Sequence, residues 1–155
     1  MDLVFGIETI VHCSDKDRLF REVNRILKPN GVFIVYDYAS VKPYEENEDY
    51  ECKLLDLVSK CGASARIESD LQWDVHFKNC GFEKISKTDL GQAIIPDLHR
   101  LALTAKKIMD HDRRLRIAFA VLPRTLTNNI LIGYLGEDCY KNRLAYYNEW
   151  IYKKI

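Results

Sequence analysis

The first 36 residues carry the pattern that most constrains the fold: an apolar segment, an amphipathic helix and a second apolar segment, joined by short connections. Apolar side chains recur over residues 19–27 with helical spacing, and Lys-Pro-Asn-Gly at residues 28–31 ends the helix because proline cannot continue it. Residues 32–36 are apolar on both faces and residues 3–5 form a shorter run, which is typical of strands buried in a parallel sheet. We therefore predict a strand–helix–strand unit with parallel strands.

The rest of the chain alternates between the same two kinds of element. Helical spacing recurs after an acidic run at residues 45–49, before Asn-Cys-Gly at residues 79–81, from 92 to 110 and around 126–135. An aromatic-rich end completes the chain as a last strand or a short helix. In all, strands are expected near residues 2–6, 32–38, 82–88 and 145–152.

Composition limits the kind of protein. The length of 155 residues suits one domain, with no linker or repeat inside it. The 23 basic residues equal the 23 acidic residues, so nucleic acid binding is not expected. No apolar run approaches the ~20 residues that span a bilayer. Five cysteines without a C-x-x-C pair predict free thiols in a reducing compartment, the cytoplasm, and no metal site.

Four segments together carry a resemblance to a known family. They are Gly6-Ile7-Glu8-Thr9-Ile10-Val11-His12 with Asp15, the helix and turn from Phe20 to Gly31, Val35-Tyr36-Asp37-Tyr38, and Cys80-Gly81-Phe82-Glu83. Together they resemble the class I S-adenosylmethionine-dependent methyltransferases, with the sterol and tocopherol C-methyltransferases closest. The likeness starts at the fourth strand of that fold. It implies an α/β, Rossmann-like methyltransferase sheet, present as its C-terminal half only.

The resemblance also implies a domain layout and a function. Residues 1–91 and 140–155 are expected to form the sheet and its flanking helices, and residues 92–139 a helical cover inserted over the acceptor site. The expected function is methyl transfer from S-adenosylmethionine to a small, lipophilic acceptor, as the C-terminal part of a longer enzyme. The family's glycine-rich cofactor loop is absent, since no G-x-G occurs. We therefore expect the chain alone to bind the cofactor weakly or not at all, and the alternative is a non-catalytic interaction domain.

Candidate catalytic and cofactor-binding residues follow the first strand. Ligands of open α/β sheets bind beyond the carboxyl ends of the strands, where Gly6 and Ile7 would meet the cofactor. Glu8 is the candidate for orienting a hydroxyl or stabilising positive charge, and His12 for accepting a proton. The structural alternatives stay open. His12 hydrogen-bonds a backbone carbonyl or caps a helix, and the Glu8 carboxylate pairs with a neighbouring group that only stabilises the fold.

Candidate substrate-binding residues come from two further segments. Asp37 and Tyr38 end the second strand at the same rim, and the alternative is that they hold a loop. Ile95 and Leu98 belong to the helical stripe that, by resemblance, forms an apolar wall for the acceptor. The alternative for that stripe is packing on the sheet.

The first strand also suggests a partner. In the family sheet a strand in the position of residues 2–6 is paired on both edges. Without that second neighbour it exposes an apolar edge, which favours association with another strand. We therefore expect this chain to associate with itself through residues 2–6.

Overall fold

Four strands form one mixed sheet in the computed structural model, which describes residues 1–110, 117 and 120–155. The strands are β1 (Leu3–Ile7), β2 (Val32–Ser40), β3 (Phe82–Asp89) and β4 (Ala145–Lys154), in the order β1-β2-β4-β3. All four predicted strands are confirmed to within two residues at either end. β1 pairs with β2 in parallel, which confirms the strand–helix–strand unit. The wholly parallel sheet expected around β2 is wrong, because β4 lies between β2 and β3 and runs antiparallel to both.

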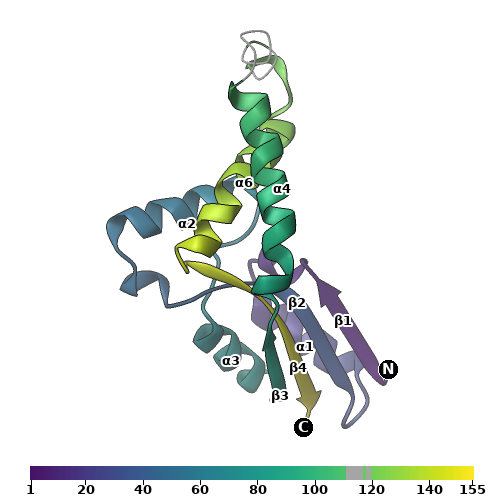
Figure 1. The fold of residues 1–155 in the computed structure, drawn as a ribbon. Coiled ribbons are helices and arrows are strands. Elements are labelled where there is room, and N and C mark those ends of the chain that lie inside the picture. The colour runs from purple at the N-terminus through teal and green to yellow at the C-terminus, as the bar shows by residue number, and fades with distance from the viewer. Residues whose placement is uncertain (111–116, 118–119) are drawn as a thin grey trace.

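Helices occupy two places relative to the sheet (Figure 1). The first group, α1 (Lys16–Ile26) and α3 (Asp70–Asn79), packs on one face, where the two helices also contact each other. The second group is α2 (Asp49–Cys61), α4 (Gly91–Asp110) and α6 (Arg124–Lys141). In that group α6 packs against both α2 and α4. Two short 3₁₀ turns, η1 (Ile10–His12) and η2 (Tyr44–Glu46), complete the elements.

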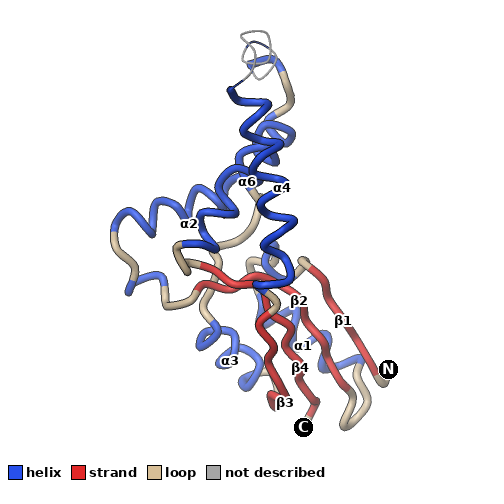
Figure 2. Tube along the Cα trace, in the orientation of Figure 1, coloured by secondary structure: helices blue, strands red, loops and turns tan. Residues whose placement is uncertain are grey.

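The α4–α6 pair rises from the sheet end where β2 finishes and β4 begins (Figures 1 and 2). Both chain termini lie at the opposite end of the sheet (Figure 1). The predicted helical insertion at 92–139 is helical wherever the structure describes it, except for a short turn before α6. Residues 111–116 and 118–119 of that insertion lie outside the described part.

An aromatic layer joins the sheet to α1 and α3. The Phe77 ring of α3 stacks between Phe20 of α1, at 4.0 Å between centroids, and Tyr152 of β4, at 3.6 Å. Beside it, Trp73 stacks on Trp150 of β4 at 4.7 Å. All five side chains are buried. Large aromatic side chains dominate core energetics, so this layer is the main attachment of the helices to the sheet.

The opposite face of β1 carries no such layer. Leu3, Phe5 and Ile7 alternate along the strand and each is more than half exposed. The expectation that residues 3–5 form a buried strand is therefore wrong for Leu3 and Phe5: only Val4, between them, packs against the core. In the described part of the chain β1 has a single neighbour, β2, and forms an edge of the sheet.

Two local features fix the ends of α1. At its start, Asp15 caps the helix by accepting a 2.9 Å hydrogen bond from the backbone N–H of Arg18. In the turn after α1, Asn30 takes the left-handed conformation at φ 63°. Asparagine tolerates that region better than other side-chain-bearing residues, so Lys-Pro-Asn-Gly ends the helix as expected.

Candidate functional site

A cavity of about 210 Å³ lies where β1 and β2 reach their carboxyl ends, between that edge of the sheet and α2, α4 and α6. Most of its walls are apolar, with Leu55 and Val58 from α2 and Ile132 from α6. Polar side chains among its lining residues are Glu8, His12, Tyr38, Ser64 and Tyr140. An apolar cavity with a few converging polar groups is the usual form of a small-molecule site.

Glu8 is placed by a tight turn directly after β1. Its backbone N–H donates to the carbonyl of Tyr36 at 2.8 Å, which extends the β1–β2 ladder by one residue. Its φ of 48° lies in the left-handed region, which is costly for a residue with this side chain. Such strain persists only where surrounding contacts enforce it and is concentrated at functional sites. The Glu8 carboxylate is exposed at the cavity.

Asp37 holds the turn in place and does not line the cavity. Its Oδ2 accepts hydrogen bonds from the N–H groups of Ile10 at 2.9 Å and Val11 at 3.0 Å, and its Oδ1 accepts one from Tyr38 at 2.9 Å. Burial raises the pKa of Asp37, although these three hydrogen bonds act in the opposite direction. The prediction that Asp37 contacts substrate is therefore corrected: it has no free oxygen facing the cavity, and the loop-holding alternative describes it.

His12 both lines the cavity and makes a structural hydrogen bond. Its Nδ1 lies 3.2 Å from the backbone carbonyl oxygen of Ala63. Because a carbonyl only accepts, Nδ1 carries the proton, and in the neutral ring Nε2 keeps a free lone pair. The backbone contact expected as the structural alternative is thus present, and it leaves the second ring nitrogen able to accept a proton.

Tyrosine side chains surround Glu8. The rings of Tyr38 and Tyr147 meet edge to face at 4.8 Å. Burial, followed by the charge of Glu8, raises the pKa of Tyr147 to about 12. The same two causes raise the pKa of Tyr38. These hydroxyls therefore stay protonated at neutral pH.

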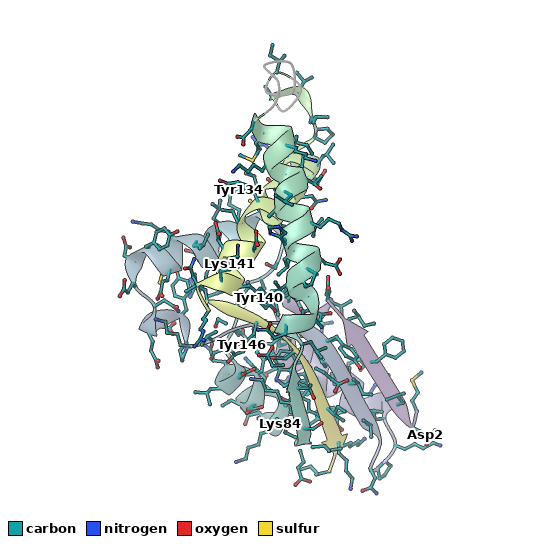
Figure 3. All side chains as sticks on the ribbon, viewed as in Figure 1. Asp2, Lys84, Tyr134, Tyr140, Lys141 and Tyr146 are labelled. Atoms are coloured by element: carbon teal, nitrogen blue, oxygen red, sulfur yellow. The ribbon has the colours of Figure 1, made fainter. Side chains whose placement is uncertain are left out.

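Sequence reasoning missed Tyr140, which completes this end of the cavity. It lies near the end of α6 that adjoins the sheet (Figure 3). The spacing of Ile132, Gly136 and Tyr140 places them on one face of the helix, since residues four apart lie one above the other. That spacing was the available signal, but nothing in the sequence showed which partner the face meets.

The other predicted site residues divide. Leu98 of α4 lines the cavity, whereas Ile95 is half-buried and is not part of the wall. Gly6 and Ile7 do not reach the cavity; Ile7 is exposed on the open face of β1. No group of three or more histidine, cysteine, aspartate or glutamate residues within 1–110 and 120–155 is placed to hold a metal ion. None of the described helices is long and apolar enough to cross a membrane.

Comparisons with known proteins agree with this geometry. Residues 1–35 match the family model described as a methyltransferase domain. A sterol 24-C-methyltransferase of Aspergillus fumigatus is 33% identical over 90 residues, which are 57% of this chain and 24% of that protein. Squalene methyltransferase 1 of Botryococcus braunii is 29% identical over 92 residues, 59% of this chain and 24% of that protein. The chain thus spans about a quarter of the length of these relatives.

Solved structures extend the likeness to the whole fold. The crystal structure of a putative sarcosine dimethylglycine methyltransferase from Galdieria sulphuraria superposes with a TM-score of 0.72 at 16% identity, over 99% of this chain and 52% of that one. Geranyl diphosphate C-methyltransferase from Streptomyces coelicolor A3(2), solved with S-adenosyl-L-homocysteine, superposes at 0.69 and 13% identity, over 100% and 48%. The predicted resemblance to the S-adenosylmethionine-dependent methyltransferases, including the sterol enzymes, is confirmed, and the α/β fold is theirs.

The cavity does not suit S-adenosylmethionine as a whole. Among the described residues, the lining contains no lysine or arginine that could meet the carboxylate of the cofactor. Gly6 offers no space for the cofactor either. The position that a Cβ would take there is 3.0 Å from Thr9 Oγ1, so the same turn already occupies that space. The described residues thus do not by themselves form a pocket for the whole cofactor.

Proposed function

We propose that this chain forms the acceptor-binding part of an S-adenosylmethionine-dependent methyltransferase that acts on a small, lipophilic molecule. One observation carries the proposal: in a methyltransferase fold, the carboxyl ends of β1 and β2 meet an apolar cavity with Glu8 and His12 at its wall. Ligand sites of open α/β sheets lie at that edge. The names of the relatives support a lipophilic acceptor, since they include sterol and squalene methyltransferases.

Glu8 and His12 have separate roles in this proposal. The carboxylate of Glu8 orients a hydroxyl of the acceptor or stabilises positive charge that develops on it. His12 accepts the proton that an acceptor gives up on methylation, through the Nε2 that its bond to Ala63 leaves free. S-adenosylmethionine would supply the methyl group; Gly6 and Ile7, the residues expected to meet it, do not line the cavity.

The α4–α6 pair serves as the cover. Leu98, Ile132 and Tyr140 from these helices already form walls of the cavity. In this role residues 92–139 shape the acceptor site and exclude water from it. A site without water strengthens the electrostatic action of Glu8 and prevents loss of the methyl group to solvent.

The test is transfer of tritium from methyl-labelled S-adenosylmethionine into hexane-extractable product. It uses a longer polypeptide that carries this chain together with the cofactor-binding half of the fold and, separately, the 155-residue chain alone, with squalene and a Δ24 sterol as acceptors. We expect label in the organic phase for the longer polypeptide. We also expect Glu8→Gln to lower the rate by on the order of 100-fold, because it removes the charge but keeps the shape of the side chain. Glu22→Gln, on the exposed side of α1, is the matched control and should leave the rate unchanged.

Three outcomes would contradict parts of the proposal. Absence of label together with absence of cofactor binding by calorimetry would favour the alternative, a non-catalytic interaction domain that keeps the methyltransferase fold but lacks the cofactor site. Equal rates for wild type and Glu8→Gln would remove Glu8 from the chemistry. The calorimetric titration also covers the 155-residue chain. Micromolar binding of S-adenosylmethionine to it would contradict the expectation that the chain alone binds the cofactor weakly or not at all.

A further inference from the structure

One polar atom at the cavity has neither a structural nor a catalytic role in the description above. The hydroxyl oxygen of Tyr140 is buried and has no hydrogen-bond partner among the described residues. Leaving a buried hydroxyl unpaired costs about 1–3 kcal/mol, and such groups in native proteins call for an explanation. Because Tyr140 lines the cavity, a ligand there is placed to supply the missing partner.

The surroundings of Tyr140 define the kind of partner. Burial raises the pKa of Tyr140, and the charges of Asp89 and Glu8 add to this, so the phenol stays neutral and keeps its proton to donate. As far as the structure describes the chain, the cavity wall holds the carboxylate of Glu8 and no lysine or arginine. An anionic ligand group would face that negative charge uncompensated. A neutral oxygen, with lone pairs and no charge, suits both the donor and its neighbours.

We propose that Tyr140 determines acceptor specificity by donating a hydrogen bond to a neutral oxygen, a hydroxyl or a carbonyl, on an otherwise apolar acceptor. This rests on the proposed function, since it treats the cavity as the acceptor site. A site built to hydrogen-bond a ligand oxygen discriminates strongly against the analogue that lacks it, because the buried donor is then left unpaired. In this proposal the apolar walls of the cavity contribute binding affinity, and the Tyr140 hydroxyl distinguishes acceptors that carry the oxygen from those that lack it.

The experiment compares three compact aromatic probes by equilibrium dialysis against the 155-residue chain. They are 2-naphthol, 2-methylnaphthalene, in which a methyl replaces the hydroxyl, and the anion 2-naphthoate. We expect 2-naphthol to bind about tenfold more tightly than 2-methylnaphthalene, the ratio that corresponds to one satisfied buried hydrogen bond. The anion should bind more weakly than 2-naphthol.

Two substitutions on α6 separate the role of the hydroxyl from that of the ring. Tyr140→Phe should bring the two neutral probes to within about threefold of each other, with 2-methylnaphthalene bound as in wild type. Tyr134→Phe is the matched control, because it removes a hydroxyl from the same helix at an exposed residue outside the cavity wall (Figure 3). It should keep the full preference for 2-naphthol.

Each remaining outcome decides against the inference in a recognisable way. Equal binding of both neutral probes to wild type, or a preference that survives Tyr140→Phe, would overturn the role of Tyr140 and leave the apolar acceptor site intact. Tighter binding of 2-naphthoate would overturn the neutral-oxygen class. Failure of every probe to bind would overturn the acceptor site itself, and the tritium transfer assay then decides separately whether the enzyme function fails with it.

Discussion

The two faces of the sheet differ in how far their side chains are buried, although both carry apolar residues. On one face, Phe77 and its neighbours are closed between α1, α3 and the strands, with no exposed surface. On the other, Leu3, Phe5 and Ile7 of β1 lie open (Figure 1 shows β1 at the edge of the sheet). Apolar character alone therefore does not decide burial here. A face of the sheet is buried where helices such as α1 and α3 pack on it.

The largest expected effect comes from a matched pair of substitutions, one on each face. Phe77→Ala should lower the free energy of unfolding by about 3–5 kcal/mol, because it empties a site enclosed by aromatic rings. Phe5→Ala should change it by less than about 0.5 kcal/mol at protein concentrations low enough for the chain to be monomeric, since the side chain is then 66% exposed. Urea unfolding followed by tryptophan fluorescence measures both.

Equal losses for the two variants would break the contrast between the faces. That result would mean that Phe5 is covered in solution by another copy of the chain. Repeating the unfolding at several protein concentrations distinguishes this case, because a midpoint that depends on concentration reports association.

A smaller effect is expected at Asp37, which ties the covered core to the cavity turn. Asp37→Asn should lower the free energy of unfolding by about 1–3 kcal/mol. The carboxylate uses both oxygens as acceptors, and an amide offers only one. Denaturant unfolding measures the loss.

The loss should also depend on pH in a defined direction. Burial raises the pKa of Asp37 in the folded protein, so the folded state binds the extra proton just above the ordinary aspartate pKa. In that window the stability of wild type falls as pH rises, while the asparagine variant has nothing to titrate at this position. The deficit of Asp37→Asn should therefore be largest in acid and shrink as pH rises. A deficit that grows toward neutral pH would contradict the raised pKa.

Most of the fold was predictable because its signals are local. The helical spacing of residues 19–27 and the turn at Asn30 need only neighbouring residues, and they predicted the βαβ unit correctly. The antiparallel insertion of β4 between β2 and β3 depends on pairing between residues at least 59 positions apart, for which the single sequence has no signal. The same limit explains why β1 was expected to be buried.

The candidate site was predictable only where it follows a strand. Glu8 and His12 come directly after β1, so the rule for open sheets places them at the right edge. Asp37 was misassigned as a substrate contact because the direction of its carboxylate depends on the path of η1. Tyr140 was missed because it lies 132 positions after Glu8 in the sequence, and only tertiary packing brings both to the same cavity.

The smallest effect concerns association through β1, where the two edges of the sheet can be compared. β1 has no charged side chain, whereas the opposite edge, β3, carries Lys84 and Lys87, and charged edges resist pairing. We expect the 155-residue chain to self-associate with increasing concentration, measured by size-exclusion chromatography with light scattering. Phe5→Lys should weaken the dimer at least about tenfold, which is the loss expected when one phenylalanine no longer becomes buried.

Ile85→Lys on β3 is the matched control for Phe5→Lys, because Ile85 is similarly exposed, at 56%, but lies on the protected edge. It should leave association unchanged. A clean monomer of wild type at every concentration would contradict the predicted pairing, and the open face of β1 would then tolerate water without a partner. If instead Ile85→Lys weakens the dimer and Phe5→Lys does not, the association runs through β3, and the charged residues there do not protect that edge.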